Sequence, residues 1–291
     1  MSVAGSSHDS DAQAAVDAFF DRDAPNWEAI YERHDVFSVI HQHRRRIALD
    51  WVQNLQLGPA TRILEIGCGA GLLSVQLARR GFEVESVDST TAMVDLARRN
   101  AIRAGVHVAV AQADAHRLEG HSDGSYALVL ALGVIPWLHS PELAVAEMSR
   151  VLEGGGHLII NADNRARLNH LIDPLLNPVV GPAVGAARAL RNLGRPRIES
   201  MPATMLHWPR QFDALLTRHD LHKIRAQTFG FGPFSLMGRR FVSETHSVRL
   251  HFRLQSLADR RIPWLRSTGA QYIVLARKEE TSGFTDVSST S

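Results

Sequence analysis

The stretch Ile63-Leu64-Glu65-Ile66-Gly67-Cys68-Gly69-Ala70-Gly71 runs from a short apolar segment into three closely spaced glycines. Its apolar residues predict a buried strand. An apolar run with helical spacing follows from Leu72 to Ala78. Glycines let the backbone approach a ligand and leave amides free at a helix N-terminus. This order of strand, glycine turn and helix therefore predicts a nucleotide-binding site in an α/β fold.

The spacing of the glycines restricts the kind of nucleotide. A dinucleotide fingerprint reads Gly-x-Gly-x-x-Gly, whereas here the third glycine comes one position early, at Gly71. No Lys-Ser/Thr pair follows, so the turn is not a phosphate-binding P-loop. Acid-x-Gly-x-Gly-x-Gly after a strand resembles motif I of the class I S-adenosylmethionine methyltransferases. The alternative is an ordinary glycine-rich turn between a strand and a helix.

Composition sets the broad class. With 291 residues, 45% of them hydrophobic, the chain can bury one large core in one or two domains. The sequence has no uninterrupted apolar run of membrane-spanning length, and its small, polar first residues lead us to expect no signal peptide. The single cysteine, Cys68, permits no internal disulfide and suits a cytoplasmic location. Aromatic residues do not interleave with basic ones, so no nucleic-acid partner is expected.

The charge of the chain is unevenly distributed. Residues 1–185 hold 15 Lys/Arg against 22 Asp/Glu, whereas residues 186–278 hold 17 against 5. The basic second half favours an anionic substrate, an acidic carrier protein or a membrane surface as partner. The alternative is a solvated, arginine-rich face. The sequence predicts nothing about the oligomeric state.

Short apolar strands alternate with helices in the middle of the chain. This alternation predicts a Rossmann-like, mostly parallel sheet with helices on both faces. The predicted strands are 62–66, 83–87, 107–112, 126–131, 155–161, 221–229 and 270–277. The predicted parts are a helical cap (1–58), a cofactor-binding core (59–161), a lid insertion (162–205), the rest of the core with an inserted substrate-side segment (206–278) and a disordered tail (279–291).

Three helices are expected in the cap, at 11–22, from Pro25 onward and at 36–55, after ten disordered residues. The Pro/Gly-rich lid region contains an amphipathic piece near Ala183–Leu193. A linker packed away from the site is the alternative to a lid.

The ends of the predicted strands offer what S-adenosylmethionine needs. Asp88 can accept both ribose hydroxyl protons, or it caps the next helix. Asp114 can bind the adenine amino group, or it caps a turn. Met93 can pack on adenine, and Glu65 holds the glycine turn. The predicted cofactor-binding set is Tyr31, Glu65, Gly67, Cys68, Gly69, Gly71, Asp88, Ser89, Met93, Asp114, Ala115, Ala131 and Leu132.

Taken together, residues 62–161 resemble the class I S-adenosylmethionine-dependent methyltransferases. The run from Pro141 to Leu158, with its Gly154-Gly155-Gly156, looks like the small-molecule branch that includes ubiquinone and sterol methyltransferases. The resemblance implies S-adenosylmethionine as cofactor. It also implies a seven-stranded sheet whose last strand, 271–277, is antiparallel.

Several motifs of other methyltransferases are missing. The positions after the fourth strand, 132–137, lack the Asn/Asp-Pro-Pro-Tyr/Phe of amide and adenine N-methylation. Asp163-Asn164 is similar to a pair in metal-dependent catechol enzymes, but the partner acid after the fourth strand is absent, so no metal is expected.

In the cap, Phe20 and the run Trp27-Glu28-Ala29-Ile30-Tyr31 with the helix after it resemble the N-terminus of magnesium-protoporphyrin methyltransferases. This resemblance points to Tyr31 near the acceptor; a role in the core or over the cofactor is the alternative. Among fifteen histidines, His139 is favoured as a base because it follows the fourth strand. The predicted catalytic candidates are His139, Tyr31, His34 and His207.

The sequence thus predicts methyl transfer from S-adenosylmethionine to a hydrophobic, anionic or carrier-tethered small molecule, on oxygen. Lipids and quinone-like molecules of secondary metabolism fit this description. Two alternatives stay open. One is non-methyl chemistry in the same site, such as cyclisation, and the other is a non-catalytic cofactor-binding subunit.

Overall fold

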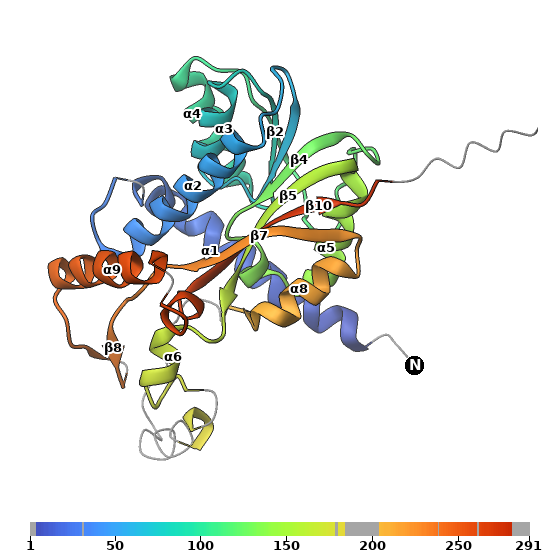
Figure 1. The fold of residues 1–291 in the computed structure, drawn as a ribbon. Helices are drawn as coiled ribbons and strands as arrows, with labels where there is room; N and C mark the ends of the chain where they lie inside the picture. The colour runs from blue at the N-terminus through green and yellow to red at the C-terminus, as the bar shows by residue number, and fades with distance from the viewer. Residues whose placement is uncertain are drawn as a thin grey trace, which may run out of the picture.

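A single twisted sheet forms the centre of the molecule (Figure 1). The computed structural model describes residues 4–30, 32–177, 180–183, 204–237, 239–260 and 262–280. Within these residues the strands of the sheet are β1 (Arg62–Ile66), β2 (Glu83–Asp88), β3 (Ala109–Gln112), β4 (Tyr126–Ala131), β5 (Leu152–Asn164), β6 (Leu206–His207), β7 (Leu221–Phe229) and β10 (Gln271–Lys278).

The strand order confirms the predicted fold class. It runs β3-β2-β1-β4-β5-β10-β7, with the short β6 paired to β5 outside this path. Strands β1 to β5 pair in parallel, and β10 is antiparallel to both β5 and β7. The last strand of the chain is therefore the antiparallel one, as the sequence predicted.

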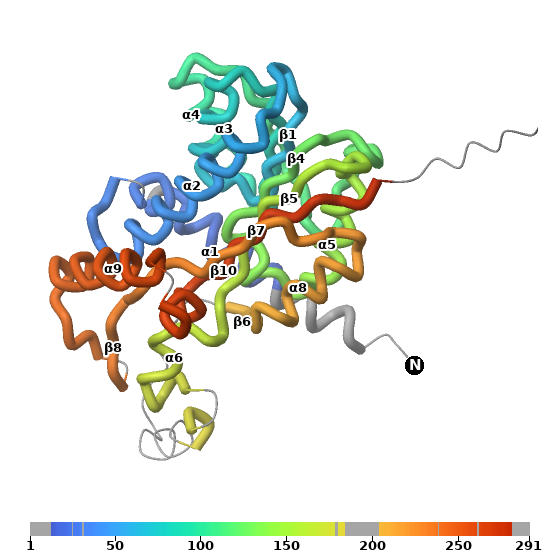
Figure 2. The backbone as a smooth tube through the Cα atoms, in the orientation of Figure 1, coloured from blue at the N-terminus to red at the C-terminus, as the bar shows by residue number. Residues whose placement is uncertain are grey.

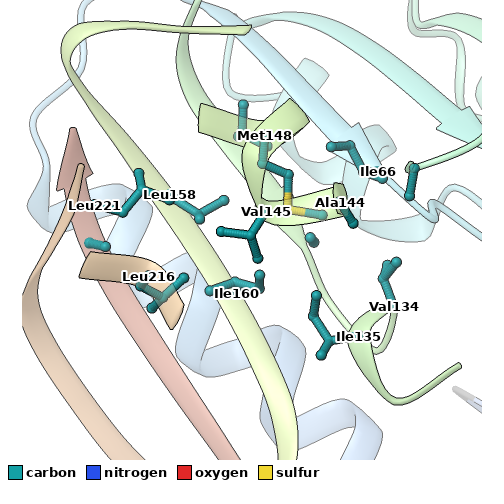
Figure 3. Close-up of a cluster of buried hydrophobic side chains, with 14 of the residues drawn as sticks. Ile66, Val134, Ile135, Ala144, Val145, Met148, Leu158, Ile160, Leu216 and Leu221 are labelled. Atoms are coloured by element: carbon teal, nitrogen blue, oxygen red, sulfur yellow. The ribbon is translucent and has the colours of Figure 1, made fainter. Parts of the chain in front are cut away.

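Helices cover both faces of the sheet because side chains alternate between the faces along each strand. On one face Leu64 and Ile66 pack against α5 (Pro141–Val151) and α8 (Pro209–Thr217). Figure 3 shows this cluster, in which Met148 of α5 lies among the strand side chains. On the other face Ile63 packs against α2 (Val36–Asn54) and α3 (Leu72–Ala78). A further helix, α4 (Thr91–Ala104), follows β2.

The N-terminal cap differs from the prediction. One helix, α1 (Ala4–Ala29), replaces the two that were expected, and it begins within the first ten residues, which were expected to be disordered. Pro25 lies inside the helix, where proline costs about 3 kcal/mol in an isolated helix. The helix continues because Ala24, next to it, is buried against α4 with Trp27 and Phe20. Tertiary packing thus outweighs the local signal.

Two segments stand outside the regular alternation (Figure 2). After β5 come α6 (Leu168–Ile172) and then β6. Half of the predicted lid, namely positions 178–179 and 184–203, lies outside the described residues, and this part includes the amphipathic piece from position 184 onward. After β7 come a hairpin of β8 (Ser235–Leu236) and β9 (Arg239–Arg240), then α9 (Glu244–Asp259) and the 3-10 turn η2 (Leu265–Ser267). Among helices in the described ranges, none combines the length and apolar character needed to cross a membrane.

Candidate functional site

The glycine turn adopts backbone conformations that other residues strongly disfavour. Gly67, Gly69 and Gly71 have φ angles of 65°, 52° and 70°. A Cβ atom on Gly67 would lie 2.4 Å from Cγ2 of Val134. A Cβ atom on Gly71 would lie 2.8 Å from Cβ of Ala97, so the turn requires glycine on conformational grounds at three positions and on steric grounds at Gly67 and Gly71.

Asp88 holds the turn from the neighbouring strand. Its Oδ2 accepts a hydrogen bond from the Gly69 amide at 2.9 Å, and its Oδ1 accepts one from the Thr90 amide at 3.1 Å. Burial raises the pKa of this carboxyl, against the hydrogen bonds that lower it. Oδ1 also accepts a hydrogen bond from the Thr90 hydroxyl at 3.2 Å, whereas Oδ2 keeps a second acceptor position that a ligand hydroxyl can use.

Glu65 ties β1 to the next two elements. Its carboxylate accepts a hydrogen bond from the Ser74 hydroxyl of α3, which lies 2.7 Å from the Ser86 hydroxyl of β2. Burial raises the pKa of Glu65 to about 7, opposing the effect of the Ser74 hydrogen bond. Glu65 thus fixes the turn and places an ionisable carboxyl beneath it.

These residues open into a cavity of about 360 Å³, within the size range of small-molecule sites. Ten of the predicted cofactor-binding residues line it: Glu65, Gly67, Cys68, Gly69, Asp88, Ser89, Met93, Asp114, Ala115 and Leu132. Of the others, Gly71 is the N-cap residue of α3, Ala131 is fully buried within β4, and Tyr31 lies outside the described residues. Their direct roles stay predictions.

Asp114 lines the cavity and is held by a histidine. Its Oδ1 accepts hydrogen bonds from the backbone amide of His116 at 2.9 Å and from Nδ1 of the same residue at 2.6 Å. The side-chain bond to His116 lowers the pKa of Asp114. The carboxylate is therefore held in one orientation, and its Oδ2 accepts no hydrogen bond from the described residues.

The predicted histidine bases do not line the cavity. His139 stacks on His116, with ring centroids 3.9 Å apart, which places it near Asp114. His34 is exposed on the loop between α1 and α2. His207 is half-buried beside Phe212, with ring centroids 5.5 Å apart. The structure therefore gives none of the three a position on the wall, and their catalytic roles remain untested predictions.

A chain of aromatic rings forms one wall of the cavity, which the sequence analysis did not assemble. The rings of Phe20 and Trp137 lie 5.1 Å apart, those of Phe20 and Trp27 5.4 Å, and those of Phe37 and His41 4.2 Å. Burial, followed by the nearby charge of Arg44, lowers the pKa of His41 to about 3, so this ring is neutral. The wall thus presents flat, uncharged surfaces to a ligand.

Arg44 is the second feature that the sequence analysis missed. Its side chain lines the cavity, the residue is only 7% exposed, and it makes no ion pair or donated hydrogen bond with the described residues. The guanidinium lies over Gly133, where a Cβ atom would come within 2.5 Å of Nη1. Burial raises the pKa of Glu65 and of Asp163, two acids of the same cavity, and the charge of Arg44 opposes this effect, but it forms no ion pair with either. Arg44 therefore presents a buried positive charge to the cavity.

Asp163 and Asn164, which the sequence paired as possible metal ligands, have separate roles. Asn164 is fully buried, and its amide donates to the carbonyls of Ser267 and Gly269 at 2.9 and 2.8 Å. Asp163 lines the cavity 3.8 Å from Nη1 of Arg167, and burial raises its pKa. In the described part of the chain, no group of three or more His, Cys, Asp or Glu side chains could hold a metal ion.

The segment that carries the glycine turn matches a known family of protein domains. Residues 64–160 match the sequence model of a methyltransferase domain. These residues form a methyltransferase domain. The matched segment runs from β1 into β5 and contains the glycine turn, Asp88 and Asp114.

Relatives of this methyltransferase domain are ubiquinone biosynthesis O-methyltransferases. That of Alkalilimnicola ehrlichii is 33% identical over 126 residues, which cover 43% of this chain and 51% of that protein. That of Ralstonia nicotianae is 25% identical over 142 residues, 49% of this chain and 59% of that protein. The chain thus spans about half the length of these relatives.

Solved structures share the methyltransferase fold along most of the chain. Magnesium protoporphyrin IX methyltransferase from Synechocystis PCC 6803, with bound SAH, superposes with a TM-score of 0.60 at 16% identity, over 92% of this chain and all of that one. The [4+2]-cyclase SpnF superposes with a TM-score of 0.52 at 18% identity, over 81% of each chain. At such identities the likeness concerns the fold alone.

Proposed function

We propose that the protein transfers the methyl group of S-adenosylmethionine to an oxygen atom of a hydrophobic, aromatic small molecule. One observation supports this most: a single cavity joins the glycine turn, Asp88 and Asp114 to an aromatic wall from the cap. The part of the cavity that is lined by the glycine turn, Asp88 and Asp114 suits a nucleoside cofactor. The part that is lined by the aromatic wall suits a flat apolar acceptor.

The residues present fit the cofactor group by group. Asp88 would hold the ribose hydroxyls and Asp114 the adenine amino group, with Met93 against the ring. Arg44 would supply a cation for the cofactor's carboxylate, and its buried position on the cavity, without an ion pair among the described residues, supports this assignment. When bound, S-adenosylmethionine supplies a methyl group already activated on a sulfonium.

The chain's own contribution to the reaction would be to orient the acceptor and exclude water. The aromatic wall formed by Phe20, Trp27 and Trp137 can hold a flat acceptor in one plane. Orientation of this kind can contribute roughly 7–11 kcal/mol, whereas a general base adds about 10²–10⁴-fold. Asp163, a carboxylate on the same cavity, would accept the proton that an acceptor hydroxyl loses.

Oxygen is the proposed acceptor atom because the relatives named above are O-methyltransferases of ubiquinone biosynthesis. Their name also favours a hydrophobic, quinone-like acceptor. Cyclisation is the alternative within this fold, since the [4+2]-cyclase shares it and fold alone does not fix the chemistry. A non-catalytic subunit fits less well because a mere binder of the cofactor needs no second, aromatic compartment.

Calorimetry tests the cofactor site directly. The wild type should bind S-adenosylmethionine, and an Asp88→Ala variant should lose about 1.5–3 kcal/mol of binding free energy because it lacks the charged acceptor for a ribose hydroxyl. Asp95→Ala, an exposed acid on α4, is the matched control and should bind as the wild type does. Full binding by Asp88→Ala would refute the site.

Detection of S-adenosylhomocysteine tests the reaction itself. Incubation with S-adenosylmethionine and a panel of substituted phenols should release one molecule of S-adenosylhomocysteine for each methyl ether formed. Cofactor binding with a transformed acceptor but no S-adenosylhomocysteine would favour the cyclisation alternative. Cofactor binding without any product would contradict a phenolic acceptor.

A further inference from the structure

The segment between β7 and β10 forms a small unit of its own. Phe231, Phe234, Ala258 and Leu265 make a buried cluster, against which Leu168 of α6 also packs. Figures 1 and 2 place α9 and α6 at the end of the molecule away from α4. The inner side of α9 is thus occupied by this cluster, and its outer side faces solvent.

Three arginines lie in a row on the outer side of α9 and form what we call the arginine stripe. Arg249, Arg253 and Arg260 are exposed and, being four and seven residues apart, lie on the same side of the helix. None of the three forms an ion pair with a described residue. The acids of α9 are engaged elsewhere: Glu244 pairs with Arg240, and Asp259 accepts a hydrogen bond from Gln255. Asp259 keeps its charge, so three arginines stand against one acid without an ion pair, and this part of α9 carries a net positive charge.

Large apolar side chains border this stripe. Phe252 is 51% exposed and lies on α9 beside Arg249 and Arg253. At the two ends of the helix, Phe241 is 59% exposed and Trp264 is 62% exposed. Single exposed apolar residues are common on protein surfaces, but here one exposed ring lies on the helix that carries the stripe and two more lie within five residues of its ends.

A second cavity lies between this unit and the cap. It measures about 430 Å³, and its lining includes Pro233, Arg240 and Glu244. Trp27 and Phe37 line both this cavity and the one that contains the glycine turn. The segment that carries the arginine stripe is therefore separated from the proposed acceptor site by two aromatic side chains.

We propose that the exposed face of α9, with Phe241 and Trp264 at its ends, binds the surface of a bilayer that contains anionic lipids. Arginines bind lipid phosphates, and aromatic rings enter the headgroup region below them. Arginine alone would serve an acidic protein equally well. The exposed aromatic rings favour lipid because they gain by leaving water for the apolar boundary of the bilayer.

This surface suits an enzyme whose acceptor is hydrophobic. Such an acceptor dissolves in the bilayer, and the second cavity lies between the lipid-binding unit and the aromatic wall. The delivery of the acceptor rests on the proposed function. The binding of lipid does not, so each can fail without the other.

Cosedimentation with vesicles tests the surface without any need for turnover. The whole chain should sediment with vesicles of phosphatidylcholine and phosphatidylglycerol, and much less with phosphatidylcholine alone. An R249E/R253E variant should bind the mixed vesicles at least tenfold more weakly. Its matched control is R79E/R99E, which reverses two exposed arginines near α3 and α4. Circular dichroism should show that both variants are folded.

A second pair of variants tests the aromatic contribution. F252S should weaken binding several-fold, whereas I102S, which changes a residue of α4 that is 79% exposed, should not. Equal binding of the wild type to both kinds of vesicle would overturn the proposal, as would equal loss in R249E/R253E and R79E/R99E. Binding to an acidic carrier protein in the absence of vesicle binding would likewise contradict it.

Discussion

Replacing Arg44 by methionine should weaken cofactor binding without weakening the fold. Methionine has a similar length but no charge, and the arginine is only 7% exposed, with no ion pair among the described residues. A hydrogen bond to a charged group contributes about 1.5–3 kcal/mol, so the Kd for S-adenosylmethionine should rise by roughly 10- to 150-fold. The protein without ligand should keep about the same stability, because the loss of the attraction between Arg44 and the acids Glu65 and Asp163 is offset by the removal of a buried charge.

Two ligands separate this effect from a general disturbance of the site. Calorimetry should show the loss for S-adenosylmethionine, whose carboxylate Arg44 is proposed to bind. Binding of 5′-methylthioadenosine should not change, because that molecule has the adenine and ribose but lacks the amino-acid end. Thermal unfolding without ligand gives the stability. Wild-type affinity of the Arg44→Met variant for S-adenosylmethionine, or an equal loss with both ligands, would refute the reasoning.

Three further predictions concern the turn and the buried acids. Gly67→Ala should abolish cofactor binding in calorimetry and lower the melting temperature, because the new methyl meets Val134 at a positive φ; unchanged binding would be inconsistent with the observed turn. Asp163→Asn should lower kcat by about 10²–10⁴-fold while the Kd for cofactor stays the same, and the loss should shrink with more acidic phenols. A kcat insensitive to the change would exclude Asp163 as the proton acceptor. For Glu65 the pKa is raised to about 7 in the folded state, so its contribution to the free energy of unfolding is present below pH 4.5 and is lost as the pH rises through about 7. Denaturant titrations of the ligand-free protein should show this decline, and Glu65→Gln should remove it; the same decline in the variant would assign it to other groups.

The sheet and the glycine turn could be predicted because their signals are local. Short apolar runs bounded by glycine and polar residues fix strands such as β1 and β7, whose ends match the prediction. The positive φ of Gly67 follows from a tight turn between a strand and a helix. Parallel pairing then brings the end of β1 next to those of β2 and β4, so Asp88 could be assigned to the site without coordinates.

The cap required tertiary information. Pro25 is a strong local signal for a helix break, yet α1 continues because packing against α4 holds it. For the same reason, no sequence pattern could show that Phe20 of α1 meets Trp137 of the loop after β4. The aromatic wall exists only through this meeting of distant segments.

Arg44 is different, because a signal for it was present. It is one of three consecutive arginines, but it alone follows Ile40 by four residues and precedes Ile47 by three. It therefore belongs to the buried stripe of α2, where a charge needs a partner. The histidine candidates failed to reach the wall for the opposite reason. Proximity in sequence to the end of β4 did not determine where the His139 ring would point, and the ring stacks on His116.

The central claim is that this cavity holds the cofactor and the acceptor side by side, and a crystal structure with S-adenosylhomocysteine tests it most directly. The ribose hydroxyls should bind the Asp88 carboxylate, adenine should lie against Met93, and the amino-acid carboxylate should meet Arg44, with the sulfur facing the aromatic wall. A nucleoside bound elsewhere, or bound here with Arg44 turned away from it, would contradict the account.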